Sequence, residues 1–375
     1  MAAPQYVSAG DPQLFSVIYT GSPAQQQQLA RSWAKFKQPD PATLKPYEVW
    51  ARPTSQSVPQ VMVDCCMPPS APAGMYRIEV FVPSIKATVR DAHYSVAHNF
   101  RMENGVEVFD EAQVTVNQAY YNDQWVKIGW YHLSPASQPQ SGRVRLTNYS
   151  QNTWSWIAFT PVRWIYIPEE EDTQQFDLPV GSDDDRAGPL LENINFYPNK
   201  PRWTAGWYDY TPFLEWYVKG VHPGADLNST LSPSADKGAP VYAIADGLVT
   251  FAGAAGSWGM IAVIWHPDAL VTLPDGTVQR QHIYARYGHL TKDLLIQSGG
   301  HVTRGQQIGK IGLMAGATAG WHLHFDLSFT ETLRQAPSYW TPHRSRPRFD
   351  VRKDVWANYL DPFNFLMDNH KIKIK

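Results

Sequence analysis

Two short groups of histidine and carboxylate side chains, about a hundred residues apart, carry the strongest chemical signal in this sequence. His322 and His324 are separated by one residue, and His222 precedes Asp226 by four positions. On a β-strand, residues i and i+2 point to the same face, so the later pair can face one point in space. Three ligands drawn from such groups hold a zinc ion and leave its fourth position to water or substrate. The spacing therefore indicates a catalytic zinc site.

A further histidine, His289, lies between these two groups in the segment Tyr287–Leu290. Imidazole is suited to accepting or delivering a proton near neutral pH. The sequence has no His-Glu-x-x-His segment, so the glutamate base of many zinc hydrolases is missing. Histidine would have to serve as the base. The alternative is that each of these histidines is an ordinary structural residue.

The elements that must position these side chains are predicted to be mainly β-strands. The 375 residues include 15 Trp, 19 Tyr, 30 Pro and 25 Gly, a mixture typical of short strands joined by many turns. Apolar and polar residues alternate over 75–82, 111–118, 125–131 and 143–147, which predicts an antiparallel β-sandwich over residues 61–167. In the second domain, residues 191–375, strands are predicted at 241–245, 247–252, 260–265 and 321–327, with a hairpin tip at 273–277.

The rest of the chain is predicted to be less regular. Residues 1–60 are proline-rich and polar, and they are interpreted as an irregular N-terminal arm with a short helix at Leu29–Phe36. Residues 168–190 contain the acidic runs Glu169–Asp172 and Asp183–Asp185 and are interpreted as a solvated linker.

Charge and cysteine content exclude several classes of protein and site. The formal net charge is −2, which gives no reason to expect nucleic-acid binding. No apolar stretch is long enough for a membrane span. Cys65 and Cys66 are the only cysteines, so a thiolate zinc site and a disulfide framework are excluded, and two buried thiols are expected.

Residues 222–363 resemble the lysostaphin/LytM family of zinc endopeptidases, which cut peptide bonds in bacterial cell-wall peptidoglycan. The resemblance runs in order through the motifs His222–Asp226, Gly238–Gly247, Tyr287–Leu290, Val302–Gly312 and Gly320–Phe325, and it closes near Asp361-Pro362. It implies a LytM-type antiparallel β-sheet domain with a zinc-binding groove.

The resemblance also implies a role for each candidate site residue. It places the Zn²⁺ ligands at His222, Asp226 and His324 and the catalytic residues at His289 and His322. One of these two histidines would take the proton of the attacking water. The other would stabilise the oxyanion or protonate the leaving amine, and the sequence leaves the assignment open.

This sequence departs from the family pattern at a few positions. Asp326 stands where the family usually has Glu, and Trp321 stands where a smaller residue or proline is common. Residues 266–286 are longer than the compact hairpin of the family, so the rim of the groove is expected to differ. Trp258 and Tyr284 either line the groove or belong to the core.

Residues 73–167 resemble golvesin-type β-sandwich domains, through segments such as Ala73–Pro83, Trp125–Trp130 and Val144–Asn148. Aromatic side chains there either stack on sugar rings or fill the core. Cell-wall glycan is therefore a second expected partner, beside peptidoglycan peptides.

The sequence thus predicts a zinc metalloendopeptidase acting on peptidoglycan, with an N-terminal accessory domain. The alternative is a non-catalytic protein that binds wall glycan or peptide, or activates an amidase. The first residues show no signal-peptide pattern. Because the implied substrate lies outside the cytoplasm, we expect an extracellular or surface location and a leader missing from this chain. A phage-borne lysin would need no leader.

Overall fold

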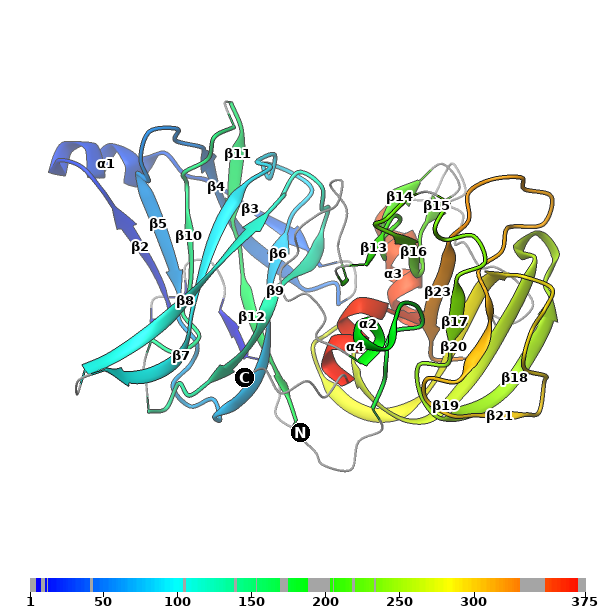
Figure 1. Cartoon of the computed structure of the whole chain (residues 1–375). Coiled ribbons are helices and arrows are strands. Elements are labelled where there is room, and N and C mark those ends of the chain that lie inside the picture. The colour runs from blue at the N-terminus through cyan, green and yellow to red at the C-terminus, as the bar shows by residue number, and fades with distance from the viewer. Residues whose placement is uncertain are drawn as a thin grey trace. The chain divides into compact units, whose positions relative to one another are not determined.

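β-Strands make up most of the regular structure, which is divided between two units (Figure 1). The computed structural model describes residues 5–7, 11, 13–40, 43–103, 106–137, 140–152, 154–168, 175–187, 203–204, 206–217, 220–232, 234–330 and 348–369. The first unit consists mainly of residues 1–169 and the second mainly of residues 170–375. Paired strands run antiparallel in both units. The predicted mainly β, antiparallel fold is confirmed.

The first unit is a sandwich of antiparallel sheets around a large apolar core, with a smaller buried cluster of Tyr47, Phe81 and Trp125. Val63, Ile78 and Ile157, which lie on different sheets, are all buried in that core. The first sheet has the order β1 (Gln5–Val7), β12 (Val162–Ile167), β6 (Gly74–Val82) and β9 (Gln124–Leu133). The second has the order β2 (Phe15–Tyr19), β5 (Val61–Cys65), β10 (Val144–Thr147), β7 (Ala92–Glu103) and β8 (Val106–Val116). The third has the order β11 (Trp156–Phe159), β4 (Pro46–Pro53) and β3 (Ala34–Pro39).

The prediction of an irregular arm over residues 1–60 is wrong for the described part of that segment. Strands β2, β3 and β4 are integral to the sheets, and β4 pairs with β11, about a hundred residues later in the chain. The predicted helix is also misplaced, because helix α1 spans Pro23–Arg31 and Ala34 already begins β3. Ser22 caps α1, because its hydroxyl accepts a hydrogen bond from the backbone N–H of Gln25. The side-chain carbonyl of Gln25 in turn accepts a hydrogen bond from the backbone N–H of Ser22. The polar glutamine run is therefore helical.

The second unit is built on a large sheet that carries the candidate site residues. Its order is β13 (Trp207–Asp209), β16 (Ala225–Ser229), β23 (Leu323–Ser328), β20 (Val278–Leu290), β19 (Met260–Thr272), β18 (Gly247–Ala254) and β21 (His301–Val302), and β24 (Tyr359–Leu360) also pairs with β23. Smaller antiparallel pairs join β14 (Trp216–Tyr217) to β15 (Gly220–Val221) and β17 (Pro240–Tyr242) to β22 (Gln307–Lys310). The predicted hairpin tip at 273–277 joins β19 to β20.

Short helices complete the second unit: α2 (Asp183–Ala187), α3 (Arg348–Asn358), α4 (Pro362–Asn369) and a 3₁₀ turn at Gly256–Trp258. The interpretation of residues 168–190 as a solvated linker is wrong where the segment is described. Phe176, Leu178 and Val180 are fully buried, and the Phe176 ring packs edge-on against Phe365 of α4. Alternating apolar residues after the acidic run therefore anchor this segment in the second unit.

Both cysteines are free thiols, with Cys65 buried and Cys66 half-buried. Within the described ranges, no helix has the length and apolar character that crossing a bilayer requires.

Candidate metal centre

The candidate site residues come from adjacent strands of the large sheet in the second unit. Asp226 on β16 and His324 on β23 are directly opposite each other in the register. His222 lies just after β15, and the turn Pro223-Gly224 leads from it into β16. A Cβ on Gly224 would lie 2.5 Å from the Phe325 carbonyl oxygen, so only glycine permits this close approach to β23.

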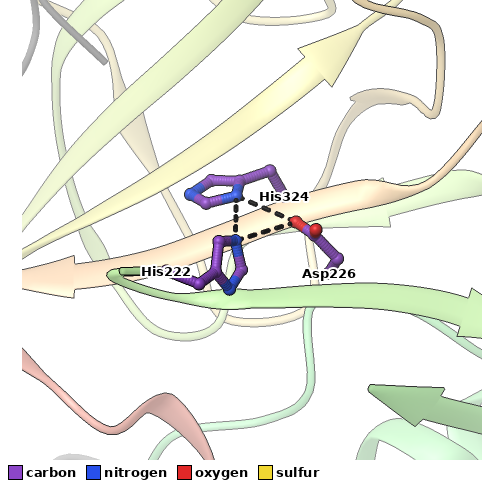
Figure 2. Close-up of side chains that lie close together, drawn as sticks. All are labelled: His222, Asp226 and His324. Atoms are coloured by element: carbon purple, nitrogen blue, oxygen red, sulfur yellow. Dashed lines mark hydrogen bonds and ion pairs between the residues drawn. The ribbon is translucent and has the colours of Figure 1, made fainter. Parts of the chain in front are cut away.

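Three ligand-type atoms converge at one point, as Figure 2 shows. His222 Nε2 lies 3.1 Å from His324 Nδ1, His324 Nδ1 lies 3.0 Å from Asp226 Oδ1, and His222 Nε2 lies 3.2 Å from that same oxygen. The His222 and His324 side chains are buried, and the Asp226 side chain is 15% exposed. The predicted trio of His222, Asp226 and His324 is thus brought together.

The donor set and its spacing fit a zinc ion. Imidazole nitrogen and carboxylate oxygen bind zinc at about 2.0–2.2 Å, so ligand atoms at tetrahedral positions lie about 3.3 Å apart. The three measured separations, 3.0 to 3.2 Å, are close to that value. Burial alone would raise the pKa of Asp226, but the His222 and His322 imidazoles hold the pKa well below its usual range. Asp226 is therefore an anion, as a metal ligand must be.

The other two histidines lie beside this cluster with their rings near each other. The ring centroids of His289 and His322 are 4.7 Å apart, and His322 Nε2 lies 3.6 Å from Asp226 Oδ1. His289 Nδ1 donates to the Trp258 carbonyl at 3.0 Å, and His322 Nδ1 donates to the Gly320 carbonyl at 2.8 Å. Because a carbonyl oxygen only accepts, both rings carry their proton on Nδ1 when neutral. Each therefore keeps an Nε2 lone pair.

His289 is held in a strained and dry environment. Its φ of 60° lies in the left-handed region, which non-glycine residues seldom occupy and which is often found at functional sites. Burial, together with the neighbouring His322 and His324 rings, lowers the pKa of His289 to about 3. His289 is therefore a neutral imidazole at physiological pH. His322, by contrast, has a side chain that is 20% exposed and lies just before β23 rather than on it.

Trp258 belongs to the core rather than to the surface of the groove, and it packs beneath the candidate site. Its side chain is 1% exposed, and its indole stacks on the His289 ring at 5.1 Å between centroids. The same indole meets the His324 ring edge-on at 4.5 Å. Tyr284 is half-buried and packs against the apolar cluster that contains Trp258.

Sequence reasoning missed Arg286, which lies behind His324 together with Asp326. Arg286 is 2% exposed and forms an ion pair with Asp326, which in turn accepts from His324 Nε2 at 2.8 Å. The available signal was the position of Arg286 two residues before Gly288 and of Asp326 two residues after His324, because residues i and i+2 share a strand face.

Comparison with known proteins assigns this region to a family. The profile of peptidase family M23 matches residues 221–336. A stretch of 100 residues is 33% identical to the DD-carboxypeptidase/endopeptidase Mpg of Neisseria meningitidis, and it covers 27% of this chain and 20% of that protein. The chain thus spans only a fifth of the length of this curated relative.

Solved structures of similar proteins include two from bacterial peptidases. The catalytic domain of lysostaphin from Staphylococcus simulans is 25% identical, with 43% of this chain and 90% of that chain covered and a TM-score of 0.25. The catalytic domain of the prophage-encoded M23 protein EnpA from Enterococcus faecalis is 21% identical, with 34% and 85% covered and a TM-score of 0.23. The profile match thus places a domain of peptidase family M23 within residues 221–336 of this chain.

Proposed function

We propose that this protein is a zinc-dependent endopeptidase that hydrolyses peptide bonds in bacterial cell-wall peptidoglycan. The observation that carries the proposal is the convergence of His222 Nε2, Asp226 Oδ1 and His324 Nδ1 within 3.2 Å, beside two further imidazoles. Similarity to peptidases of family M23 and to a DD-carboxypeptidase/endopeptidase supports the substrate class.

His222, Asp226 and His324 would hold the zinc ion in this proposal. Zinc in such a site supplies a Lewis acid that lowers the pKa of water to about 7 and polarises the scissile carbonyl. The buried Trp258 indole packs against the His289 and His324 rings, so bulk water does not reach the site from that side. A site of low polarity strengthens every charge interaction within it.

His322 is the better placed of the two remaining histidines to move a proton. Its Nε2 lies 3.6 Å from Asp226 Oδ1, and its side chain is 20% exposed, so this imidazole can reach both the ligand cluster and the solvent. We assign to His322 Nε2 the transfer of a proton from the attacking water to the leaving amine. His289 has a pKa of about 3 and stays neutral, so its Nε2 serves as a hydrogen-bond acceptor that orients the water or a substrate amide.

Peptidoglycan lies outside the cytoplasm, so the proposal includes an extracellular or cell-surface location. We also propose that the first unit binds glycan. Its resemblance to golvesin-type domains is part of the same proposal. Several of its large aromatic side chains, such as Trp164, Tyr76 and Phe81, are buried and cannot reach a glycan. Trp154 is 98% exposed and is the residue best suited to stack on a sugar ring.

The test uses purified peptidoglycan and the full chain. We expect loss of turbidity and new free amino groups, abolished by a chelator and restored by zinc. His324→Ala should abolish both zinc binding and hydrolysis, and His301→Ala, which removes an exposed histidine on β21, should change neither. Mass spectrometry of the released fragments would identify the bond that is cut. Binding to peptidoglycan with no new amino groups would refute the enzyme and support a wall-binding protein instead.

A further inference from the structure

Behind His324, the second unit buries an ion pair that the reaction itself does not use. Arg286 on β20 and Asp326 on β23 are directly opposite in the strand register, with side chains 3% and 0% exposed. Arg286 Nε and Nη2 donate to Asp326 Oδ2 at 2.8 and 2.6 Å. His324 Nε2 donates to that same oxygen at 2.8 Å. One carboxylate oxygen therefore collects hydrogen bonds from both the arginine and the candidate zinc ligand.

The guanidinium of Arg286 is fixed from further directions. It lies 4.6 Å over the Trp258 ring, and the Tyr359 hydroxyl forms a hydrogen bond with it. Tyr359 is fully buried on β24, which pairs with β23. The arginine is thus held by three neighbours, and two of them, Asp326 and Trp258, also contact the His324 ring.

A contribution to folding stability does not explain why Arg286 and Asp326 are buried as an ion pair. Removing two charges from water costs several kcal/mol per ion, and replacing a buried ion pair by apolar residues is often neutral or stabilising. An arrangement that fixes a metal ligand has a separate benefit. A carboxylate on one ring nitrogen of a ligating histidine keeps the proton there, and it leaves the other nitrogen free to bind metal in a set orientation. Here Nε2 contacts Asp326 and Nδ1 faces His222 and Asp226.

We propose that Arg286 is a positioning residue for the zinc site. It holds Asp326 Oδ2 in place as the acceptor for His324 Nε2, and thereby directs His324 Nδ1 toward His222 Nε2 and Asp226 Oδ1. This inference rests on the proposed function, because it requires that the cluster bind zinc. It adds Arg286, and Tyr359 behind it, to the residues that set metal affinity.

The test compares zinc dissociation constants of folded variants, measured by competition with a chromophoric chelator. Arg286→Met should weaken zinc binding by about 10- to 100-fold and alter the visible absorption of the cobalt-substituted protein. Arg286→Lys should recover part of the affinity, because it restores the charge but not the fork of two donors. Tyr359→Phe should weaken binding by no more than about fivefold, since it removes one hydrogen bond.

Two matched controls separate positioning from general damage. Arg163→Met breaks a buried ion pair with Glu79 in the first unit, where the charged atoms are 2.6 Å apart, and should lower stability without changing zinc affinity. Tyr287→Phe removes a buried hydroxyl that accepts from the Ile244 amide, and should also leave zinc affinity unchanged. Both controls are expected to keep the wild-type cobalt spectrum.

The outcomes distinguish this inference from the proposed function. Wild-type protein that binds no zinc contradicts the proposed function itself. Wild-type protein that binds zinc, with Arg286→Met showing the same affinity and cobalt spectrum, overturns only the role of Arg286. If Arg286→Met does not fold, Asp326→Asn and Tyr359→Phe decide, because both preserve side-chain shape. Unchanged affinity in both of them would equally overturn the inference.

Discussion

Gly288→Ala tests how tightly the floor of the candidate site is packed. Gly288 lies on β20 opposite His324, and its φ is not in the left-handed region, so the effect of a methyl group is purely steric. An added Cβ would lie 2.9 and 3.0 Å from two carbons of the Trp258 indole and 3.2 Å from His324 Cβ. Carbon atoms in good contact are about 3.5–4.0 Å apart, so the Trp258 indole would have to move by roughly half an ångström or more, and His324 by roughly 0.3 Å or more.

The expected cost follows from the burial of the indole. Trp258 is 1% exposed and wedged between His289, His324 and Arg286, so it has no free space to move into. Overpacking of this kind costs about 1–3 kcal/mol. We therefore expect Gly288→Ala to lower the free energy of unfolding by about 2 kcal/mol and to weaken zinc binding, because His324 is displaced.

Urea denaturation of zinc-free and zinc-loaded protein, with a chelator titration, measures both effects. Gly309→Ala on β22 is the matched control, since its Cβ would meet only Leu294 Cδ2 at 3.4 Å and Leu290 Cδ1 at 3.7 Å. That change should be neutral or stabilising by up to about 1 kcal/mol. If Gly288→Ala behaves like Gly309→Ala in both stability and zinc affinity, the argument about the packed floor is wrong.

Two further predictions concern histidines. His289→Ala should retain zinc but slow hydrolysis by about 100-fold or more, measured as initial rates on peptidoglycan, and an unchanged rate would remove His289 from the mechanism. Burial lowers the pKa of His266 to about 4, so the unfolded chain takes up a proton near pH 6.5 while the folded chain does not. The contribution of His266 to the stability of the zinc-free protein should therefore be full above pH 6.5 and fall by about 3 kcal/mol toward pH 4. His266→Asn, whose amide can donate to the Asp246 carbonyl as His266 Nδ1 does, should flatten that dependence in urea titrations, and an unaltered pH slope would contradict the assignment.

Strands and turns that depend only on neighbouring residues could be predicted from local sequence patterns. Alternating residues gave β6 and β9 to within about two residues, and Pro274–Gly276 marked the turn between β19 and β20. The motif spacing also named the side chains that the structure brings together around Asp226. A strand places residues two apart on one face, and a short turn fixes the distance between neighbouring strands.

Features that depend on distant partners were not predictable. Strand β4 looked irregular because its prolines are at its ends and its partner β11 is about a hundred residues away. The glutamine run in α1 has no buried side chain, and the start of its helix is marked by the cap at Ser22. The role of Trp258 was open, because only the fold shows that its indole lies beneath His289 and His324.

X-ray absorption spectroscopy at the zinc edge of the loaded wild-type protein would show whether His222, Asp226 and His324 hold the metal. We expect one tightly bound zinc per chain, with scattering from two imidazole rings and a carboxylate oxygen at about 2.0–2.2 Å. His222→Ala removes one of the three ligands and should lose the bound zinc and its imidazole signal, as His324→Ala does. A spectrum with oxygen neighbours alone, or one that His222→Ala leaves unchanged, would contradict this ligand assignment.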